Sequence, residues 1–261
     1  MSLVKDIGII LESRELAEAD CDLTLLTESG YKQRILIKGI RKSKKRPIVA
    51  SELGSVIELE YYKHPGKEIY LSKEVSIRER YENLKSTYLG FLVVCAVCEL
   101  TNKLTHFGEE FPLVYKLITT AFQNLSQQKI DILLLPHYKL RLLTILGLAS
   151  KEFYCHSCEE NIFTKNKACI LEGSLDIYCG DCRMIEVSQL EVIKLLHAIS
   201  HKTYTRLLTE PIPKTLILEA NQILDRYILL QLAVECKSFD LLYKELQRNT
   251  QEIIDYQKND I

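Results

Sequence analysis

The N-terminal third of the chain alternates short apolar runs with turn residues. Runs rich in Val, Ile, Leu and Tyr cover residues 4–12, 22–27, 31–38, 55–62 and 68–74. Gly- and Pro-containing segments separate them, and such bounded β-prone runs are typical of strands. Five strands without a helical period predict a small closed β-barrel. The OB-fold is the commonest five-stranded form, and a small sandwich or an SH3-like barrel is the alternative.

After Ser76 the apolar spacing changes to that of helices. Ser76-Ile77-Arg78-Glu79 fits a capping box, which predicts a helix start there. Positions three and four apart then predict one buried helix face, made of Leu84, Tyr88, Phe91, Leu92, Cys95, Cys98 and Asn102. The helical pattern returns in residues 111–125, 130–146, 186–200 and 214–235.

These patterns predict an α+β protein: an N-terminal five-stranded OB-fold β-barrel followed by an α-helical domain with a four-cysteine zinc element. The predicted boundaries are 1–78 for the barrel and 79–246 for the helical domain, in which residues 151–186 form the zinc element. Residues 247–261 are polar, and we expect a C-terminal tail that frays.

Composition limits the function classes. Lys and Arg total 34 against 35 Asp and Glu, so the net charge of −1 gives no whole-chain argument for polyanion binding. Nine cysteines, an odd number, argue against a complete disulfide framework. The N-terminus lacks the apolar core of a signal peptide, and the longest apolar run, 89–98, is about half a membrane span. We therefore expect a reduced, soluble, cytoplasmic protein.

Two Cys-x-x-Cys pairs carry the sharpest chemical signal. Cys155 and Cys158 form the first pair, and Cys179 and Cys182 form the second. A two-residue spacer lets both thiolates reach one tetrahedral ion, and the second pair completes the shell. The pattern predicts one structural Zn²⁺, and four buried or redox-active cysteines are the alternative. Gly180 is expected to provide a backbone conformation that a Cβ disfavours.

A basic segment is the second signal. Residues 29–51 contain no acid. The candidate nucleic-acid-binding residues are the eight cations of this window, Lys32, Arg34, Lys38, Arg41, Lys42, Lys44, Lys45 and Arg46. The first three share one parity of the third strand, and the other five follow on a loop. Such a face predicts a groove for phosphates, with Tyr31, Tyr61 and Tyr62 as stacking candidates. A solvated loop or an import-like peptide is the alternative.

Catalytic signals are weak. No phosphate-binding glycine loop, nucleophile elbow or zinc-protease motif occurs. Cys95 and Cys98 form another Cys-x-x-Cys, but a mid-helix apolar position favours core packing over redox chemistry. His197 and His201 suit a metal by spacing, and a satisfied surface pair is the favoured interpretation. We expect that the protein is not an enzyme and has no catalytic residues.

Several segments, in order, resemble the RecO family of bacterial recombination mediators. They are Glu18-Ala19-Asp20 with LTLLTESG, KGIRKSKKR, the helix near Tyr88, RLLTILGL from Arg141 to Leu148, both cysteine pairs, and Cys236-Lys237-Ser238-Phe239. Glu159 is a departure, because glycine is common after the first pair in the family, and it puts that turn in doubt.

The resemblance implies a non-enzymatic role in DNA repair, DNA recombination and the DNA damage response. It implies binding of single- and double-stranded DNA, strand annealing, and loading of RecA together with RecR onto DNA coated by single-strand-binding protein (SSB). It also implies binding of the acidic SSB C-terminal tail, for which Arg206, Lys214 and Arg226 are candidates. The expected location is the bacterial cytoplasm, at the nucleoid when on DNA. An RNA-binding or ribosome-associated OB-fold protein is the alternative function.

Overall fold

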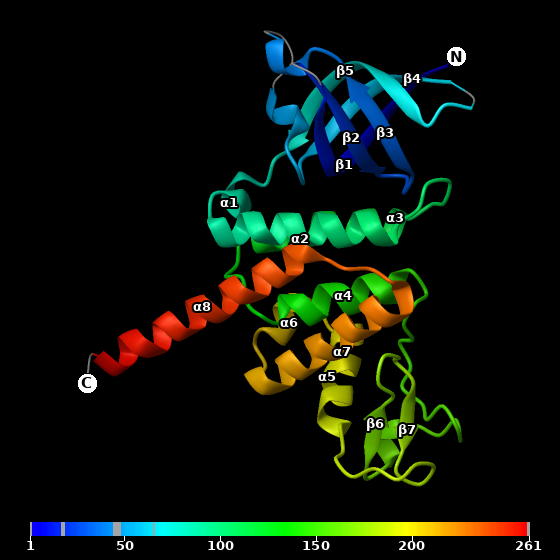
Figure 1. Cartoon of the computed structure of the whole chain (residues 1–261), viewed down its shortest axis with the longest axis vertical. Coiled ribbons are helices and arrows are strands. Elements are labelled where there is room, and N and C mark those ends of the chain that lie inside the picture. Colours follow the sequence, from blue (N-terminus) through cyan, green and yellow to red (C-terminus); the bar gives the residue numbers. More distant parts are fainter. Residues whose placement is uncertain (1, 17–18, 44–47, 65, 260–261) are drawn as a thin grey trace. The chain divides into compact units, whose positions relative to one another are not determined.

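The computed structural model describes residues 2–16, 19–43, 48–64 and 66–259 (Figure 1). The chain divides into two compact units. The first comprises residues 1–130 and 236–261, and the second comprises residues 131–235. The helices that follow the barrel in the chain are therefore shared between the two units.

The first unit begins with a closed β-barrel. Its strands are β1 (Ser2–Leu16), β2 (Asp20–Thr27), β3 (Lys32–Ile37), β4 (Val56–Lys63) and β5 (Ile69–Glu79). The order is β1-β2-β3-β5-β4, and pairing of β4 with β1 closes the barrel (Figure 1). Only β3 and β5 pair in parallel among these strands. Closure leaves no strand with an unpaired edge. The five predicted strands are confirmed.

Alternation along the strands builds the barrel core. In β3, Ile35 and Ile37 are fully buried, whereas Arg34 lies on the opposite parity and is partly exposed. The core consists of Ile10, Cys21, Leu23, Leu25, Ile35, Ile37, Ile40, Ala50, Ile57, Leu59 and Tyr61. Burial of such side chains is the main source of the barrel's stability.

The predicted helix start at Ser76 is wrong. Residues 76–79 belong to β5, where Ser76 pairs with Glu58 and Ile77 with Ile57. Ladder hydrogen bonds satisfy the backbone groups that a helix would otherwise satisfy, so pairing with β4 overrides the local capping signal. The long helix begins later and is capped by Thr87, whose Oγ1 accepts the Gly90 N–H.

The described part of the first unit also contains the α-helices α1 (Glu82–Lys85), α2 (Tyr88–Leu104), α3 (Pro112–Leu125) and α8 (Lys237–Asn259). Helix α2 packs against β1, α3 and α8. It therefore buries several sides, and the single predicted face is wrong. Tyr88 and Phe91 are exposed, whereas Val93, Val94 and Val97 are fully buried. Helix α8 continues to Asn259, beyond the predicted start of the frayed tail.

The second unit packs α4 (Leu134–Ile145), α5 (Leu190–His201), α6 (Tyr204–Leu207) and α7 (Lys214–Leu232). The buried Lys139 ammonium joins α4 to α7 by bonding Asn221 Oδ1 at 2.9 Å and the Asp225 carboxylate. Between α4 and α5 the chain forms the 3-10 turn η3 (Ile162–Thr164) and a small hairpin, β6 (Ala168–Ile170) with β7 (Ile177–Cys179). Among the described helices, none combines the length and apolarity needed to cross a membrane.

Candidate functional site

The four predicted cysteine ligands come together in the second unit. The sulfur atoms of Cys155, Cys158, Cys179 and Cys182 all lie within 4.8 Å of one another. The Sγ atoms of Cys158 and Cys179 are 3.8 Å apart. Four sulfurs about 2.3 Å from a tetrahedral zinc ion would be separated by about 3.8 Å. The cluster therefore has the size of a four-thiolate zinc site.

Two similar turns position these sulfurs. In the first, the Glu159 N–H donates to the Cys155 carbonyl at 2.8 Å, and the Cys155 N–H donates to the Glu160 carbonyl at 2.9 Å. In the second, the Cys182 N–H donates to the Cys179 carbonyl at 3.2 Å, directly after β7. Each turn folds its second cysteine back beside its first, which is why a two-residue spacer suits one shared ion.

The backbone explains Glu159 and Gly180 differently from the sequence prediction. Glu159 has φ +58°, so it holds the left-handed conformation that glycine adopts without strain. The turn doubted because of Glu159 is thus formed. Gly180 is not among the described glycines with positive φ, and the conformational reason given for it is wrong. A Cβ at Gly180 would lie 3.1 Å from Lys167 Cβ, so close packing favours glycine there.

The protein environment favours thiolate at one corner of the cluster. Burial alone would raise the pKa of the Cys155 thiol, but backbone N–H groups, first that of Cys179, outweigh it and lower the pKa to about 6. The Cys179 N–H lies 3.3 Å from Cys155 Sγ. Neighbouring sulfurs, first Cys158, raise the pKa of Cys182 to about 12. Four contacting thiols cannot all ionise without a cation among them, which is what a metal would supply.

The basic residues predicted on β3 have three different surroundings. The Arg34 guanidinium is partly exposed and pairs with the Asp22 carboxylate. Lys38 follows β3 and is exposed, as is Lys42 in the 3-10 turn η1 (Ile40–Lys42). Arg41 lies in the same turn, and its side chain is outside the described part of the chain, as are residues Lys44, Lys45 and Arg46 altogether.

Lys32 is the exception, because its side chain is covered. It is only 8% exposed, and its ammonium donates to the carbonyls of Asn102 at 2.5 Å and Thr105 at 3.1 Å. Desolvation lowers the pKa of Lys32 to about 8. A cation at the C-terminal end of α2 is favourably placed against the helix dipole. Lys32 therefore anchors α2 to the barrel and does not present its charge on the surface.

The base of the basic loop is held in place. Gly39 has φ +65°, and its N–H donates to Asp20 Oδ1 at 2.8 Å. The loop 39–54 thus leaves the barrel at a fixed point. Among the predicted stacking residues, Tyr31 is 38% exposed, whereas Tyr61 is buried, donates to Asp6 and stacks on Tyr70. Tyr61 belongs to the barrel core and is therefore unavailable for stacking on bases.

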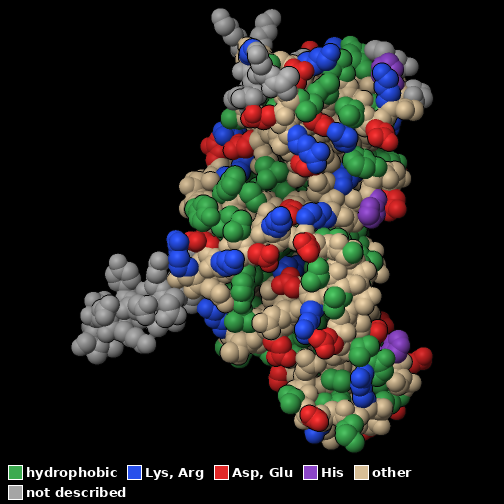
Figure 2. Space-filling view, in the orientation of Figure 1, with side chains coloured by type: hydrophobic (Ala, Val, Ile, Leu, Met, Phe, Trp, Pro, Cys, Tyr) green, Lys and Arg blue, Asp and Glu red, His purple; other side chains and the backbone are tan. Residues whose placement is uncertain are grey.

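Acidic side chains accompany the basic ones. On the face shown in Figure 2, Lys and Arg side chains are interspersed with Asp and Glu. The pairs Lys5–Glu58 and Lys73–Glu60 are examples on the barrel. Exposed pairs of this kind add little stability. They do reduce the positive potential of the strands relative to the basic loop, whose sequence contains no acid between residues 29 and 51.

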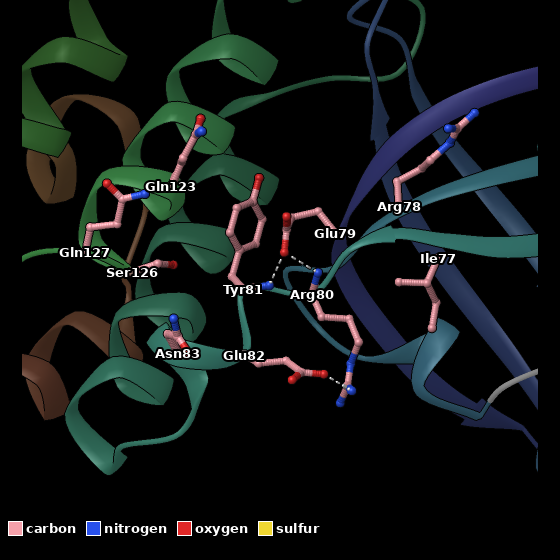
Figure 3. A pocket seen from close by; sticks show the side chains of 10 residues that line it. All are labelled: Ile77, Arg78, Glu79, Arg80, Tyr81, Glu82, Asn83, Gln123, Ser126 and Gln127. Atoms are coloured by element: carbon pink, nitrogen blue, oxygen red, sulfur yellow. Dashed lines mark hydrogen bonds and ion pairs between the residues drawn. The ribbon is translucent and has the colours of Figure 1, made fainter.

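A polar cavity of about 610 Å³ lies where β5 runs into α1 (Figure 3). Its charged groups all have partners, some of them outside the lining, such as Glu58 for Arg78. Arg80 bonds Glu52 and Glu82, and Glu79 accepts the N–H groups of Arg80 and Tyr81. The amide side chains of Asn83, Gln123 and Gln127 complete the lining on the α1 and α3 side (Figure 3). With these charges paired, the cavity offers mainly neutral donors and acceptors.

The remaining candidates serve packing. His197 contacts the rings of Phe153 and Phe163, and His201 Nδ1 lies 2.9 Å from the His197 carbonyl. Cys98 is fully buried, and burial raises the pKa of its thiol far above the ordinary value. The histidine contacts agree with a pair whose bonding is satisfied within the fold, and the burial of Cys98 agrees with core packing of the Cys95–Cys98 motif.

The three candidates for an SSB-tail pocket do not gather at one point. Lys214 begins α7, and Arg226 lies twelve residues later, about 18 Å along the helix. Arg226 also pairs with Glu172. Arg206 lies in the separate helix α6. One small pocket cannot be lined by both Lys214 and Arg226.

Known families and relatives match nearly the whole chain. The family model "Recombination protein O N terminal" matches residues 1–81, and "Recombination protein O C terminal" matches residues 85–239. The chain is 35% identical over 246 residues to the DNA repair protein RecO of Leptospira biflexa serovar Patoc, which is 94% of this chain and 99% of that relative. RecO of Thermoanaerobacter sp. (strain X514) is 23% identical over 93% of this chain and 98% of its own length.

The two family models together cover the barrel, both cysteine pairs and helices α2 to α7. The identity to the Leptospira protein extends across nearly the full length of both chains. On this evidence the chain belongs to the RecO family.

Proposed function

We propose that the protein is a non-enzymatic recombination mediator in DNA repair, with its barrel acting as an OB-fold DNA-binding domain. It binds single- and double-stranded DNA, anneals complementary strands, and with RecR helps RecA onto SSB-coated single strands. The observation that carries the proposal is the match to both RecO family models along one chain, joined to a closed five-stranded barrel with a basic loop.

The loop that follows β3 is the proposed phosphate-binding element. Lys38 and Lys42 are exposed at its start, and Lys44, Lys45 and Arg46 continue the run of cations in the sequence. Asp20 holds Gly39, so the cations start from a fixed point on the barrel. Arg34 lies on the outer face of β3, where its guanidinium also forms an ion pair with the Asp22 carboxylate. Phosphate contacts of this kind release counterions and do not read base identity.

The four cysteines are proposed to hold one structural Zn²⁺. Zinc would neutralise the thiolates and tie the two turns together, and with four sulfur ligands it would have no open position for catalysis. The fit rests on the mutual sulfur distances and on the backbone N–H groups directed at Cys155. A structural metal is consistent with a protein whose role is binding.

Charge reversal tests the DNA site. Changing Lys42, Lys44, Lys45 and Arg46 to Glu should weaken binding of single strands of any sequence. If the loop meets about four phosphates, the slope of log affinity against log salt should fall in magnitude by roughly 3. The measurement is a salt titration of oligonucleotide anisotropy, with circular dichroism to show that the variant is folded.

A matched control reverses four exposed cations of the second unit, Lys151, Lys194, Arg206 and Lys214. This variant should keep the wild-type salt slope. If the control loses the slope and the loop variant keeps it, the DNA site lies on the helical unit and the proposed barrel site is wrong.

The sugar of the bound strand distinguishes the proposed DNA-binding role from the alternative, an RNA-binding role. A DNA mediator should bind deoxyribo-oligomers at least as tightly as ribo-oligomers of equal sequence, because the 2′-OH is the group that distinguishes them. Annealing of complementary strands with SSB pre-bound, using SSB with and without its C-terminal tail, tests the proposed partner. Equal stimulation by both forms of SSB would exclude the tail as the contact.

A further inference from the structure

The loop between α2 and α3 is fastened to the barrel at the start of β3. The Phe111 N–H donates to the Gly30 carbonyl at 3.0 Å, and Tyr31 pairs with Glu110 through both backbone and side chains. Lys32 bonds the two carbonyls at the end of α2. A Cβ on Gly30 would lie 2.4 Å from the Phe111 nitrogen, so the close approach requires glycine. Residues 105–111 thus extend the barrel surface.

This loop presents an aromatic ring to solvent. Phe107 is 54% exposed, and it precedes Gly108, whose φ of +88° makes the turn. The Lys32 ammonium lies 5.0 Å from the ring centroid. The attraction between the Lys32 ammonium and one face of the Phe107 ring holds the ring in place. An exposed phenylalanine fixed in this way is available for contact with another flat group.

The ring stands beside the proposed DNA face. Lys32, which touches the ring, is the first residue of β3, and Arg34 follows about 6.6 Å along the same outer side of the strand. Lys38 and Lys42, both exposed, come next. Tyr31, 38% exposed, precedes the strand. Cationic tracks with adjacent aromatic rings are the arrangement that binds single-stranded nucleic acids.

We propose that Phe107 is a stacking platform for an unpaired base of a DNA strand that runs along the outer face of β3. The proposal rests on the proposed DNA-binding function and assigns to that site a residue outside the barrel. A base inside a duplex is already stacked on its neighbours, so Phe107 selects single strands. The phosphates of the same strand meet Arg34, Lys38 and Lys42.

Nearby acids do not block such a strand. The Glu110 carboxylate accepts the Tyr31 hydroxyl, which holds it beside that ring. Glu109 is exposed, and the exposed lysines Lys38 and Lys42 outnumber it. The Phe107 ring itself carries no charge, so stacking adds affinity without releasing counterions. This property separates the contribution of Phe107 from that of the cations.

The absence of tryptophan from the sequence makes a direct test possible. Phe107→Trp places a single tryptophan at the platform, and Phe91→Trp places one at a 48% exposed ring position on α2 as the matched control. The probe is oligodeoxythymidine of about 20 nucleotides, which is longer than one OB-fold site. Stacking should quench the indole emission of the Phe107→Trp variant and leave that of the control unchanged. A duplex of the same length should quench neither.

Affinity provides the second readout. Phe107→Ala and Phe107→Leu should each weaken single-strand binding about tenfold and duplex binding less than about twofold, with unchanged salt slopes. Leucine keeps an apolar cover over Lys32, so wild-type affinity in that variant would show that the ring is only a cover and would overturn the proposal. Binding of DNA by Phe107→Trp without quenching of its indole emission would also overturn the stacking proposal. That result would leave the proposed DNA-binding function intact. Failure of the wild-type protein to bind DNA would instead remove the proposed function.

Discussion

The barrel and the cysteine-bearing segment 151–189 are stabilised in different ways. Every barrel strand pairs with two others around a continuous apolar core. The cysteine segment has two three-residue strands and one 3-10 turn. Its buried apolar residues are Phe153, Cys155, Ile162, Ala168, Ile177 and Cys179. Two of these six residues, Cys155 and Cys179, belong to the four-cysteine cluster. The remaining four are too few to form a separate apolar core.

This difference indicates which of the two regions a bound metal would stabilise more. A barrel gains its free energy from apolar burial and loses it in increments as side chains are removed. A segment with little apolar burial depends on the bonds among its ligands, and removing one ligand affects the whole segment. The predictions below test this difference, beginning with the largest effect.

Loss of one cysteine ligand should unfold the cysteine segment and spare the barrel. Protein purified without chelator should contain about one zinc, and Cys179→Ser should lose it. Metal binding contributes on the order of 10–16 kcal/mol in small zinc peptides. Limited proteolysis should then cut first between Cys158 and Cys179. Cys169→Ser is the matched control, since Cys169 lies in the segment outside the four-sulfur group. Equal protease resistance of all three proteins would show that the metal does little for the fold.

Truncation of a side chain in the barrel core should destabilise the barrel and spare the cysteine segment. Ile57 is fully buried, so Ile57→Ala should reduce the free energy of unfolding of the first unit by about 2–5 kcal/mol. Zinc content should stay at the wild-type value. Leu3→Ala, at a position 50% exposed, should change stability little. Zinc loss from the Ile57 variant under native conditions would contradict the independence of the two regions.

Lys32 should make the stability of the first unit rise with pH. Its pKa is lowered from 10.5 to about 8, so between these values the unfolded chain binds more protons than the folded one. Stability therefore increases from pH 8 towards 10.5, by up to about 3 kcal/mol. The neutral amine still donates to both carbonyls. The measurement is urea unfolding of wild type and Lys32→Met, whose difference cancels other titrating groups. A difference independent of pH would refute the assigned burial.

The smallest effect concerns the turn at Glu159. Because its φ is +58°, Glu159→Gly should stabilise the cysteine segment by about 1 kcal/mol. The midpoint for zinc release by a competing chelator should move upward. Ser157→Gly, in the same turn but not among the positive-φ residues, should move the midpoint downward or leave it unchanged. A decrease in both variants would mean that backbone strain at residue 159 has no influence on the site.

Local pattern was enough for much of the fold. Short runs rich in Val, Ile, Leu and Tyr, separated by turn residues, predicted all five barrel strands, because such residues suit a pleated, half-buried surface. The helical ranges of α3 and α7 were predicted closely from spacing. The cluster of four cysteines was also predictable, because its geometry depends on a short spacer that the sequence shows directly.

Tertiary structure decided what covers each face. Ser76-Ile77-Arg78-Glu79 has a helix-start pattern, yet pairing with β4 holds it in β5. Lys32 and Arg34 share the outer parity of β3, and only the position of the α2–α3 loop makes one buried and the other accessible. The same loop leaves Phe107 exposed, which sequence spacing gave no reason to expect. Periodicity specifies the direction of a side chain, whereas the neighbour that meets it is set by long-range packing, which local spacing does not encode.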